Sequence, residues 1–169
     1  MKSIIFDLDQ TLVDTSTLEV YRNTRNWKEV YCNIHNCYLY DGMTEVFKYI
    51  RDHSIKVCIV SSSPRAYLEK IIGSFNIPAD YIIGYHDTFN KKPHPEPMQK
   101  AISLLNCDET DVISFGDRDI DIIAAQKANI LAIGCSWGSK DKDRLAQSQP
   151  HKTIYSPKDI IEEFIKFSN

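Results

Sequence analysis

The sequence predicts an α/β domain built around a doubly wound, Rossmann-like parallel sheet. Short apolar segments rich in Ile and Val alternate along the chain with amphipathic helical patterns. The apolar segments are nearly continuous rather than alternating with polar residues, which is typical of strands covered by helices on both faces. Strands that alternate with helices are joined by right-handed crossovers, and these generate a parallel sheet. The 169 residues suffice for one such domain with a small insertion.

The predicted strands are five short apolar segments. Each is short enough to be a strand rather than a helix, and Gly, Pro or polar residues mark the joints between elements. The third segment is the shortest and gives the weakest strand signal of the five. In chain order the predicted strands are 3–8, 56–60, 81–83, 111–115 and 130–133.

Segments with helical periodicity lie between these strands. In GMTEVFKYIRDH, apolar side chains recur at Met43, Val46, Phe47 and Ile50, which share one face of an α-helix. Pro64 begins another such segment, in keeping with the preference of proline for the first helical turn. The predicted helices are 42–53, 64–75, 97–105, 120–128 and 157–167.

Residues 15–40 interrupt this alternation. The segment is polar and aromatic, and it lies between the first strand and the helix that leads to the second. We expect a small helical cap inserted into a core domain of residues 1–14 and 41–169. Because it has room for only one or two short helices, we expect it to border a site without closing over it. Its aromatic residues are Tyr21, Trp27, Tyr31, Tyr38 and Tyr40.

Composition and charge exclude several classes of protein. Hydrophobic residues make up 43% of the chain, and the formal net charge of −3 gives no basic field for nucleic acid or an anionic membrane. No apolar run approaches the roughly 20 residues that cross a bilayer. The first apolar run stops at Asp7, too early for a signal peptide. We therefore expect a cytoplasmic protein without a membrane partner.

The cysteines do not predict a disulfide framework, because they are five in number and scattered along the chain. Cys32, His35 and Cys37 lie close enough in sequence to suggest a metal. A structural zinc site takes four ligands, usually from two paired clusters, and the sequence contains no second cluster. We interpret these three as packing residues, with zinc as the minor alternative.

Polar segments follow the ends of the predicted strands. Asp7 and Asp9 come off the first strand, SSSP follows the second, and GDRDID follows the fourth, while KKPHPEP lies between the third and the fourth. In an open parallel sheet, ligands bind at this edge. Each segment alone reads as an ordinary turn, loop or helix start. Their occurrence together, in order, indicates a binding or catalytic site.

Asp7 and Asp9 are costly at the end of a buried strand, because like charges repel and burial disfavours the charged form of each. Such a pair is useful where a hard cation is bound or where one carboxylate acts as a nucleophile. The pair alone does not decide between these uses.

Together these segments resemble the haloacid dehalogenase-like hydrolases, a superfamily mostly of Mg²⁺-dependent phosphatases. The resemblance rests on DLDQT, on Ser61, on Lys92 within KKPHPEP, and on GDRDID continuing into IIAA. It covers nearly the whole chain outside the insertion. Gln10 departs from the family pattern, in which glycine is commoner, and we expect this departure to be tolerated.

The resemblance implies a phosphatase that transfers a phosphoryl group to Asp7 and then hydrolyses the aspartyl-phosphate. In this scheme Asp9 protonates the leaving oxygen and later activates water, and Thr11 orients Asp9. The implied cofactor is Mg²⁺, held by Asp7, by the backbone carbonyl of Asp9 and by Asp117. Asp121 is either a further metal ligand or a residue that supports the ligands.

The resemblance also implies which residues bind phosphate. Lys92 neutralises the phosphate charge and holds Asp7 in place. Ser61 and the backbone N–H groups at the start of the following helix bind phosphate oxygens. Ser62 takes the place of Ser61 if the strand runs one residue further, and its backbone is the more important contributor.

Other polar residues near these segments have a less definite interpretation. We expect Lys91 and His94 to face solvent, with substrate contact as the lesser alternative for His94. In the insertion, Arg22, Arg25 and Lys28 either bind an anionic or aromatic leaving group, or accompany aromatic residues that pack the insertion against the sheet. The expected substrate is a phosphorylated small molecule or macromolecule, hydrolysed with broad selectivity, and the oligomeric state is open.

Three alternatives differ in class. A receiver domain also phosphorylates an Asp at a strand end, but it needs neither a second acid at Asp9 nor the late GDRDID segment. A non-catalytic phosphate-binding module is disfavoured because every residue that the chemistry needs is present. Dehalogenation is disfavoured because that branch does without the second acid, whereas a phosphomutase keeps both acids and remains open.

Overall fold

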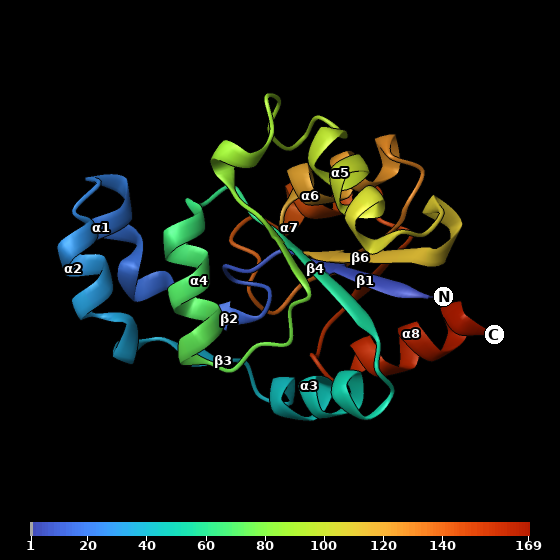
Figure 1. Cartoon of the computed structure of the whole chain (residues 1–169), viewed down its shortest axis with the longest axis horizontal. Coiled ribbons are helices and arrows are strands. Elements are labelled where there is room, and N and C mark those ends of the chain that lie inside the picture. The colour runs from blue at the N-terminus through green and yellow to red at the C-terminus, as the bar shows by residue number, and fades with distance from the viewer. Residues whose placement is uncertain (1) are drawn as a thin grey trace.

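The computed structural model describes residues 2–169, and a six-stranded parallel sheet forms its centre (Figure 1). The strands lie in the order β5-β4-β1-β6-β7-β8, and every neighbouring pair is parallel. This arrangement confirms the predicted fold class. The strands are β1 (Ser3–Phe6), β4 (Lys56–Val60), β5 (Tyr81–Ile83), β6 (Val112–Gly116), β7 (Leu131–Cys135) and β8 (Lys152–Ile154).

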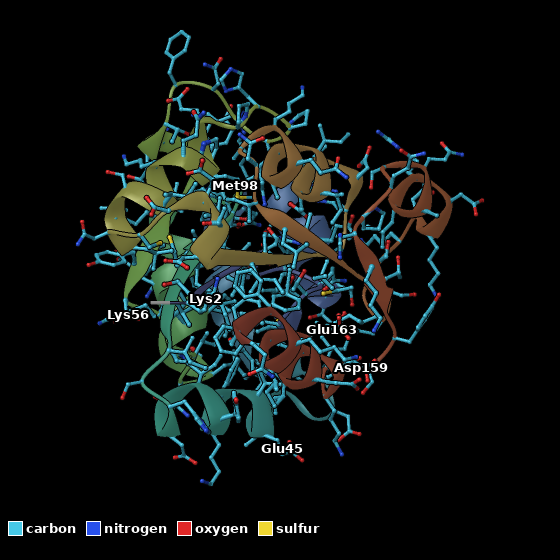
Figure 2. The ribbon with its side chains drawn as sticks, turned by 90° about the vertical axis from the view of Figure 1, so that its right-hand side faces the viewer. Lys2, Glu45, Lys56, Met98, Asp159 and Glu163 are labelled. Carbon is cyan, nitrogen blue, oxygen red and sulfur yellow. The ribbon has the colours of Figure 1, made fainter. Side chains whose placement is uncertain are left out.

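Helices cover both faces of the sheet. Figure 2 shows Met98 of one helix layer on one side of the sheet, and Glu45 and Glu163 of the other layer on the opposite side. No helix within residues 2–169 has both the length and the apolar character to cross a membrane. One layer comprises α3 (Met43–Asp52), α4 (Arg65–Ser74) and α8 (Asp159–Ser168), and the other comprises α5 (Glu96–Leu105), α6 (Asp119–Lys127) and α7 (Lys142–Gln147).

The apolar residues of each strand serve two hydrophobic clusters. In β1, Ile4 and Phe6 pack into the cluster beneath α3, α4 and α8, while Ile5 packs into the cluster beneath α5, α6 and α7. Successive side chains of a strand point to opposite faces, so a strand covered on both faces must be apolar throughout. Each such side chain contributes about 1.5–3 kcal/mol on burial.

The direction of the chain across the sheet reverses at β1. From β1 the chain moves outward to β4 and β5, then crosses to β6 on the other side and continues to β7 and β8. Phe6 pairs in register with Ile59 of β4 and with Phe115 of β6. Residues that follow these three strands therefore emerge side by side, at the point where sheets of this kind bind ligands.

The observed elements differ from those expected in several places: β6 and β7 are shifted by one or two residues, and α7 was not predicted. β1 ends at Phe6 rather than at residue 8, because the Leu8 carbonyl accepts a hydrogen bond from the Leu12 N–H (3.0 Å) and closes a turn. The strand β8 was not predicted, because it is three residues long and begins with the exposed Lys152 at the edge of the sheet. Apolar runs identify central strands more readily than such short edge strands.

The segment 15–40 is helical, and a short antiparallel strand pair brings its two ends together. Its apolar residues Leu18, Val30 and Ile34 are buried in the same cluster as the residues of α3, α4 and α8. Figure 1 shows α1 and α2 beside α4, far from both termini. Whether this segment is a domain of its own remains a prediction. Its elements are the 3₁₀ turn Ser16–Leu18, α1 (Glu19–Asn23), α2 (Trp27–Cys32) and the 3₁₀ turn Ile34–Asn36, and the hairpin of β2 (Val13–Asp14) with β3 (Tyr38–Leu39) closes its base.

Candidate active site

The ends of three strands place the candidate residues. The N–H of Asp7 donates to the Phe115 carbonyl (3.0 Å), and the N–H of Ser61 donates to the Ile83 carbonyl (2.9 Å). These bonds continue the sheet ladder one residue past β1 and β4, so both side chains have fixed positions at its edge. Asp117 follows β6 directly. The structure thus brings together the three segments that the sequence placed at this edge.

Lys92 is the centre of the buried charges. It lies in the loop that leads into α5, and its side chain is only 2% exposed. Its ammonium donates to Asp7 Oδ1 (2.8 Å) and to the Val60 carbonyl (3.0 Å), and lies 2.6 Å from Asp121 Oδ1. An ammonium has three donors. Two of them donate to Asp7 and to the Val60 carbonyl, and the ion pair with Asp121 means that Lys92 links Asp7 to Asp121.

Three carboxylates converge around this lysine. One carboxylate oxygen from each of Asp7, Asp117 and Asp121 lies within 4.8 Å of the others, and all three residues are buried. Asp121 comes this close because residue 116 is a glycine. A Cβ atom built on Gly116 would lie 2.4–2.8 Å from the Asp121 side chain, closer than atoms can approach.

The acids of the cluster hold more negative charge than Lys92 offsets. Burial raises the pKa of the Asp7 carboxyl to about 6, against the opposing charge of Lys92. Burial and the charges of Asp7 and Asp121 raise the pKa of Asp117 well above its usual range. A bound cation would relieve both effects. The donor set consists of oxygens only, as hard divalent cations require, so these residues fit such an ion.

Asp9 lies outside this cluster and faces the insertion. Its Oδ1 accepts from the hydroxyls of Thr15 (2.7 Å) and Tyr67 and lies 2.9 Å from the Arg22 guanidinium. Its Oδ2 accepts from the Ser63 hydroxyl (3.1 Å). Burial and the charge of Asp9 raise the pKa of Tyr67, so its hydroxyl keeps its proton and donates. Asp9 is thus held by donors from both the core and the insertion.

The hydrogen-bond partner of Thr11 differs from the one expected. Its hydroxyl donates to Asp117 Oδ1 (2.9 Å), whereas it was expected to orient Asp9, a role that Thr15 takes. The reason is the tight turn after β1, in which Gln10 adopts the left-handed conformation with φ 66°. This turn directs Thr11 to the cluster.

Gln10 occupies a left-handed position that glycine or asparagine would adopt at lower cost. Its side chain accepts from the Thr15 N–H (2.9 Å), and its carbonyl lies against Gly138 of the loop after β7. A Cβ atom on Gly138 would be 1.8 Å from that carbonyl oxygen. The indole N–H of Trp137 donates to the Thr11 carbonyl (2.9 Å). The loop after β7 is therefore fixed against the turn that carries Asp9.

Ser61 and Ser62 follow β4, which ends at Val60. Ser61 is buried and Ser62 is exposed, and both line the pocket described below. The N–H of Ser61 is occupied by the sheet, and that of Ser63 donates to Ser61 Oγ (3.1 Å). Among residues 2–169 the N–H of Ser62 has no acceptor, so it is the backbone donor that this turn leaves for a phosphate.

A pocket of about 710 Å³ opens over the carboxyl edge of the sheet. The core provides one wall, and α1 with its connection to α2 provides the other. The loop after β7 forms part of the rim. The charged residues that line it are Asp7, Asp9, Glu19, Arg22, Arg25, Asp117, Arg118, Asp119, Lys140, Asp141 and Arg144, and the other polar or aromatic ones include Trp27, Ser61, Ser62 and Tyr85.

Three features of the site were not predicted from the sequence. Arg118 stands inside GDRDID and was passed over in favour of the acids around it. The loop after β7 carries Lys140, and it follows a strand end like the segments that were recognised. Tyr67 was assigned to the apolar face of a helix, which it does occupy, and its hydroxyl was the signal that it also serves a polar partner.

Several other candidates lie away from the pocket. Lys91 contacts the Thr88 carbonyl and the Tyr85 ring, and His94 is exposed, with Nδ1 accepting from the Glu96 N–H (3.2 Å). Lys28 is exposed and does not line the pocket. In the part of the chain that the structure describes, Cys32, His35 and Cys37 do not form a converging set of metal ligands.

The aromatic residues of the insertion pack against the core. Trp27 lies beside Tyr67 of α4, with ring centroids 6.2 Å apart, and Tyr21 and Tyr31 also pack against the buried cluster. Trp27 lines the pocket as well. Packing against the core is therefore one role of these residues.

Comparisons with known proteins agree with this geometry. The chain is 27% identical to pyrophosphatase PpaX of Oceanobacillus iheyensis over 204 aligned positions, which cover 95% of each protein. The matches to several further PpaX proteins span just over half (57%) of those relatives. A crystal structure of a predicted phosphoglycolate phosphatase from Haemophilus somnus superposes with a TM-score of 0.84 at 20% identity, covering 96% of this chain and 97% of that one.

A second solved structure, a HAD-superfamily hydrolase from Ehrlichia chaffeensis, is 25% identical, with a TM-score of 0.73 and complete coverage of both chains. The family model for haloacid dehalogenase-like hydrolases matches residues 18–135, well over half of the sequence. The chain therefore belongs to the haloacid dehalogenase-like hydrolases.

Proposed function

We propose that this protein is a Mg²⁺-dependent phosphatase that hydrolyses small phosphate monoesters through an aspartyl-phosphate on Asp7. The observation that carries this proposal is the pair Asp7 and Asp117 on the floor of an open pocket, with Lys92 and Asp121 buried against Asp7 and Asp117. The names of the relatives, a pyrophosphatase and a predicted phosphoglycolate phosphatase, support phosphoryl chemistry.

Asp7 is the nucleophile in this proposal. Lys92 holds its Oδ1, and the bond from its N–H to Phe115 fixes its backbone, so the carboxylate has a defined direction. Its carboxylate attacks phosphorus, the bond from phosphorus to the ester oxygen breaks, and an acyl phosphate forms on Asp7. Fixing the nucleophile in advance lowers the entropic part of the barrier.

Asp9 is the proton carrier. It donates a proton to the departing ester oxygen in the first step. In the second step it accepts a proton from water, whose oxygen attacks phosphorus and breaks the bond to Asp7. Inorganic phosphate then leaves, and Asp7 is restored. The donors Thr15 and Tyr67 set the direction of the Asp9 carboxylate.

The phosphoryl oxygens meet three groups of this chain. They are the Lys92 ammonium, the Ser61 hydroxyl and the free N–H of Ser62. Asp7, Asp117 and the backbone carbonyl of Asp9 would hold Mg²⁺, with Asp121 either beside them or as a further ligand. When bound, the ion neutralises charge on the phosphoryl oxygens.

The test is phosphate release from a panel of small phosphate esters with Mg²⁺ present, together with mass spectrometry of acid-quenched protein. The proposal expects turnover of at least one ester and a phosphoryl group on the peptide that contains Asp7. Release without any phosphorylated intermediate in either wild type or an Asp9→Asn variant, which slows the second step, would contradict the covalent route.

A further inference from the structure

Two cations of the pocket lack a counter-ion. Of the cationic side chains that line it, Arg25 and Arg118 have no carboxylate oxygen within 4.0 Å among residues 2–169. An arginine on the wall of a pocket and without an acidic partner is free to bind an anion. The other three cations are already paired, as Arg22–Asp9, Lys140–Glu19 and Arg144–Asp119.

The charge of Arg118 is already used at the reacting centre. It follows Asp117 directly, and its charge acts on the buried carboxylates. Arg118 thus offsets the acids of the floor, and Arg25 is the cation that remains without such a role.

Backbone preference does not explain an arginine at position 25. Arg25 has a left-handed conformation with φ 55° at the end of α1, where its N–H donates to the Arg22 carbonyl (3.0 Å). The left-handed residues that follow α4, α5 and α6 are Asn76, Asn106 and Asn129, and those that follow α3 and α7 are Ser54 and Gln149. Asparagine and glycine adopt this conformation at less cost than arginine. The backbone conformation alone therefore gives no preference for arginine at this position.

The pocket is larger than one phosphate needs. Its volume of about 710 Å³ lies within the range of sites for whole metabolites, and Arg25 lies on the wall opposite the core. With the transferred phosphoryl group at Asp7, the leaving part of the substrate extends from the floor into the space that the insertion lines. Asn23 and Trp27 line that wall beside Arg25.

We propose that Arg25 forms a second anion-binding subsite, for a carboxylate or phosphate group on the leaving part of the substrate. This inference rests on the proposed function, because that function places the transferred phosphoryl group at Asp7. The substrate class is then a phosphate ester or anhydride with two anionic ends. The guanidinium offers paired N–H donors that match the two oxygens of either group.

The test uses phosphonates that bind without being hydrolysed, measured by titration calorimetry with Mg²⁺ present. Each of three pairs has the same phosphonate head, with a tail that ends in a carboxylate or a methyl group. The pairs are phosphonoacetate with ethylphosphonate, 3-phosphonopropionate with propylphosphonate, and 4-phosphonobutyrate with butylphosphonate. In at least one pair, wild type should bind the carboxylate member about tenfold more tightly or better.

Arg25→Gln should bring that ratio close to one and leave the affinity for the alkylphosphonates unchanged. Lys28→Gln is the matched control, because Lys28 lies in the same insertion, outside the pocket, and it should keep the wild-type ratio. Equal or undetectable binding in all three pairs by wild type, or a ratio that survives in Arg25→Gln, would overturn the subsite.

Hydrolysis of p-nitrophenyl phosphate separates this inference from the proposed function. Its leaving group has no second anionic end, so its hydrolysis by wild type tests the phosphatase without the subsite. If wild type hydrolyses this ester but binds the two members of each phosphonate pair equally, the proposed subsite is wrong and the proposed phosphatase function stands. If wild type binds the carboxylate members selectively but hydrolyses no ester, the subsite stands and the proposed phosphatase function is wrong.

Discussion

The two walls of the pocket hold their charges in different ways. On the core side, the side chains of Lys92 and its partners Asp7 and Asp121 are at most 5% exposed. Asp7 follows β1, Lys92 lies in the loop before α5, and Asp121 lies in the first turn of α6. On the insertion wall, Glu19 pairs with Lys140 of the loop after β7, and both side chains are about half exposed. Exposed ion pairs contribute about 0–1 kcal/mol, whereas removing one partner of a buried pair costs about 3–5 kcal/mol.

This difference indicates a division of labour. The buried wall cannot rearrange without leaving an unpaired charge in the interior, so it suits chemistry that needs fixed geometry. The insertion wall can exchange one partner for another at little cost, so it suits the selection of substrates. Substitutions on the core wall should therefore have much larger effects than those on the insertion wall.

The largest effect should come from Asp7→Asn. The amide keeps the size of the side chain but cannot attack phosphorus, so phosphate release should fall by about 10⁴-fold or more. The measurement is phosphate release from the best ester, with circular dichroism to confirm the fold. Asp119→Asn is the control, because Asp119 also lines the pocket but pairs only with Arg144, and it should keep activity within a few-fold. Wild-type turnover by Asp7→Asn would refute the mechanism.

Removal of Mg²⁺ should abolish activity and lower stability. A cation at this cluster would offset the carboxylates whose pKa values burial raises, and its binding would stabilise the folded chain by about 2.7 kcal/mol at 100 times its Kd. The measurement is the melting temperature with Mg²⁺ and with a chelator. In Asp117→Asn the Mg²⁺-dependent rise should be largely lost. An equal rise in this variant would place the cation elsewhere.

Lys92→Ala should reduce kcat/KM by about 10²–10³-fold, because it removes one fixed contact to the transition state. It should also destabilise the fold, since Asp7 and Asp121 lose their buried partner. Its neighbour Lys91 is the matched control, since Lys91 contacts Thr88 and Tyr85 rather than the acids. Lys91→Ala should change kcat/KM by less than about threefold. Equal losses in the two variants would contradict the central role of Lys92.

The sequence predicted the positions of those site residues that directly follow a strand of the sheet. Asp7, Ser61 and Asp117 each follow a strand of the central sheet, and parallel pairing forces such residues to one edge. Long apolar runs identified these strands, so the placement followed. Catalytic roles at these positions remain predictions that the variants above can test.

The sequence pattern did not predict the contacts that depend on the geometry of turns. Thr11 and Thr15 are both near Asp9 in sequence, and only the left-handed turn at Gln10 decides that Thr15 contacts Asp9 while Thr11 contacts Asp117. The approach of Gly138 to this turn joins segments more than 120 residues apart, and no local pattern signals it.

The smallest effect should be at Gln10 itself. Any variant there loses the side-chain bond to the Thr15 N–H, but glycine also relieves the cost of φ 66° and alanine does not. We therefore expect Gln10→Gly to exceed Gln10→Ala by about 1 kcal/mol in free energy of unfolding, measured by urea denaturation. At Ser103, an exposed residue within α5, the order should reverse, with alanine more stable than glycine by about 1 kcal/mol. If alanine were also the more stable residue at position 10, the turn would not have the left-handed conformation that directs Thr11 to Asp117.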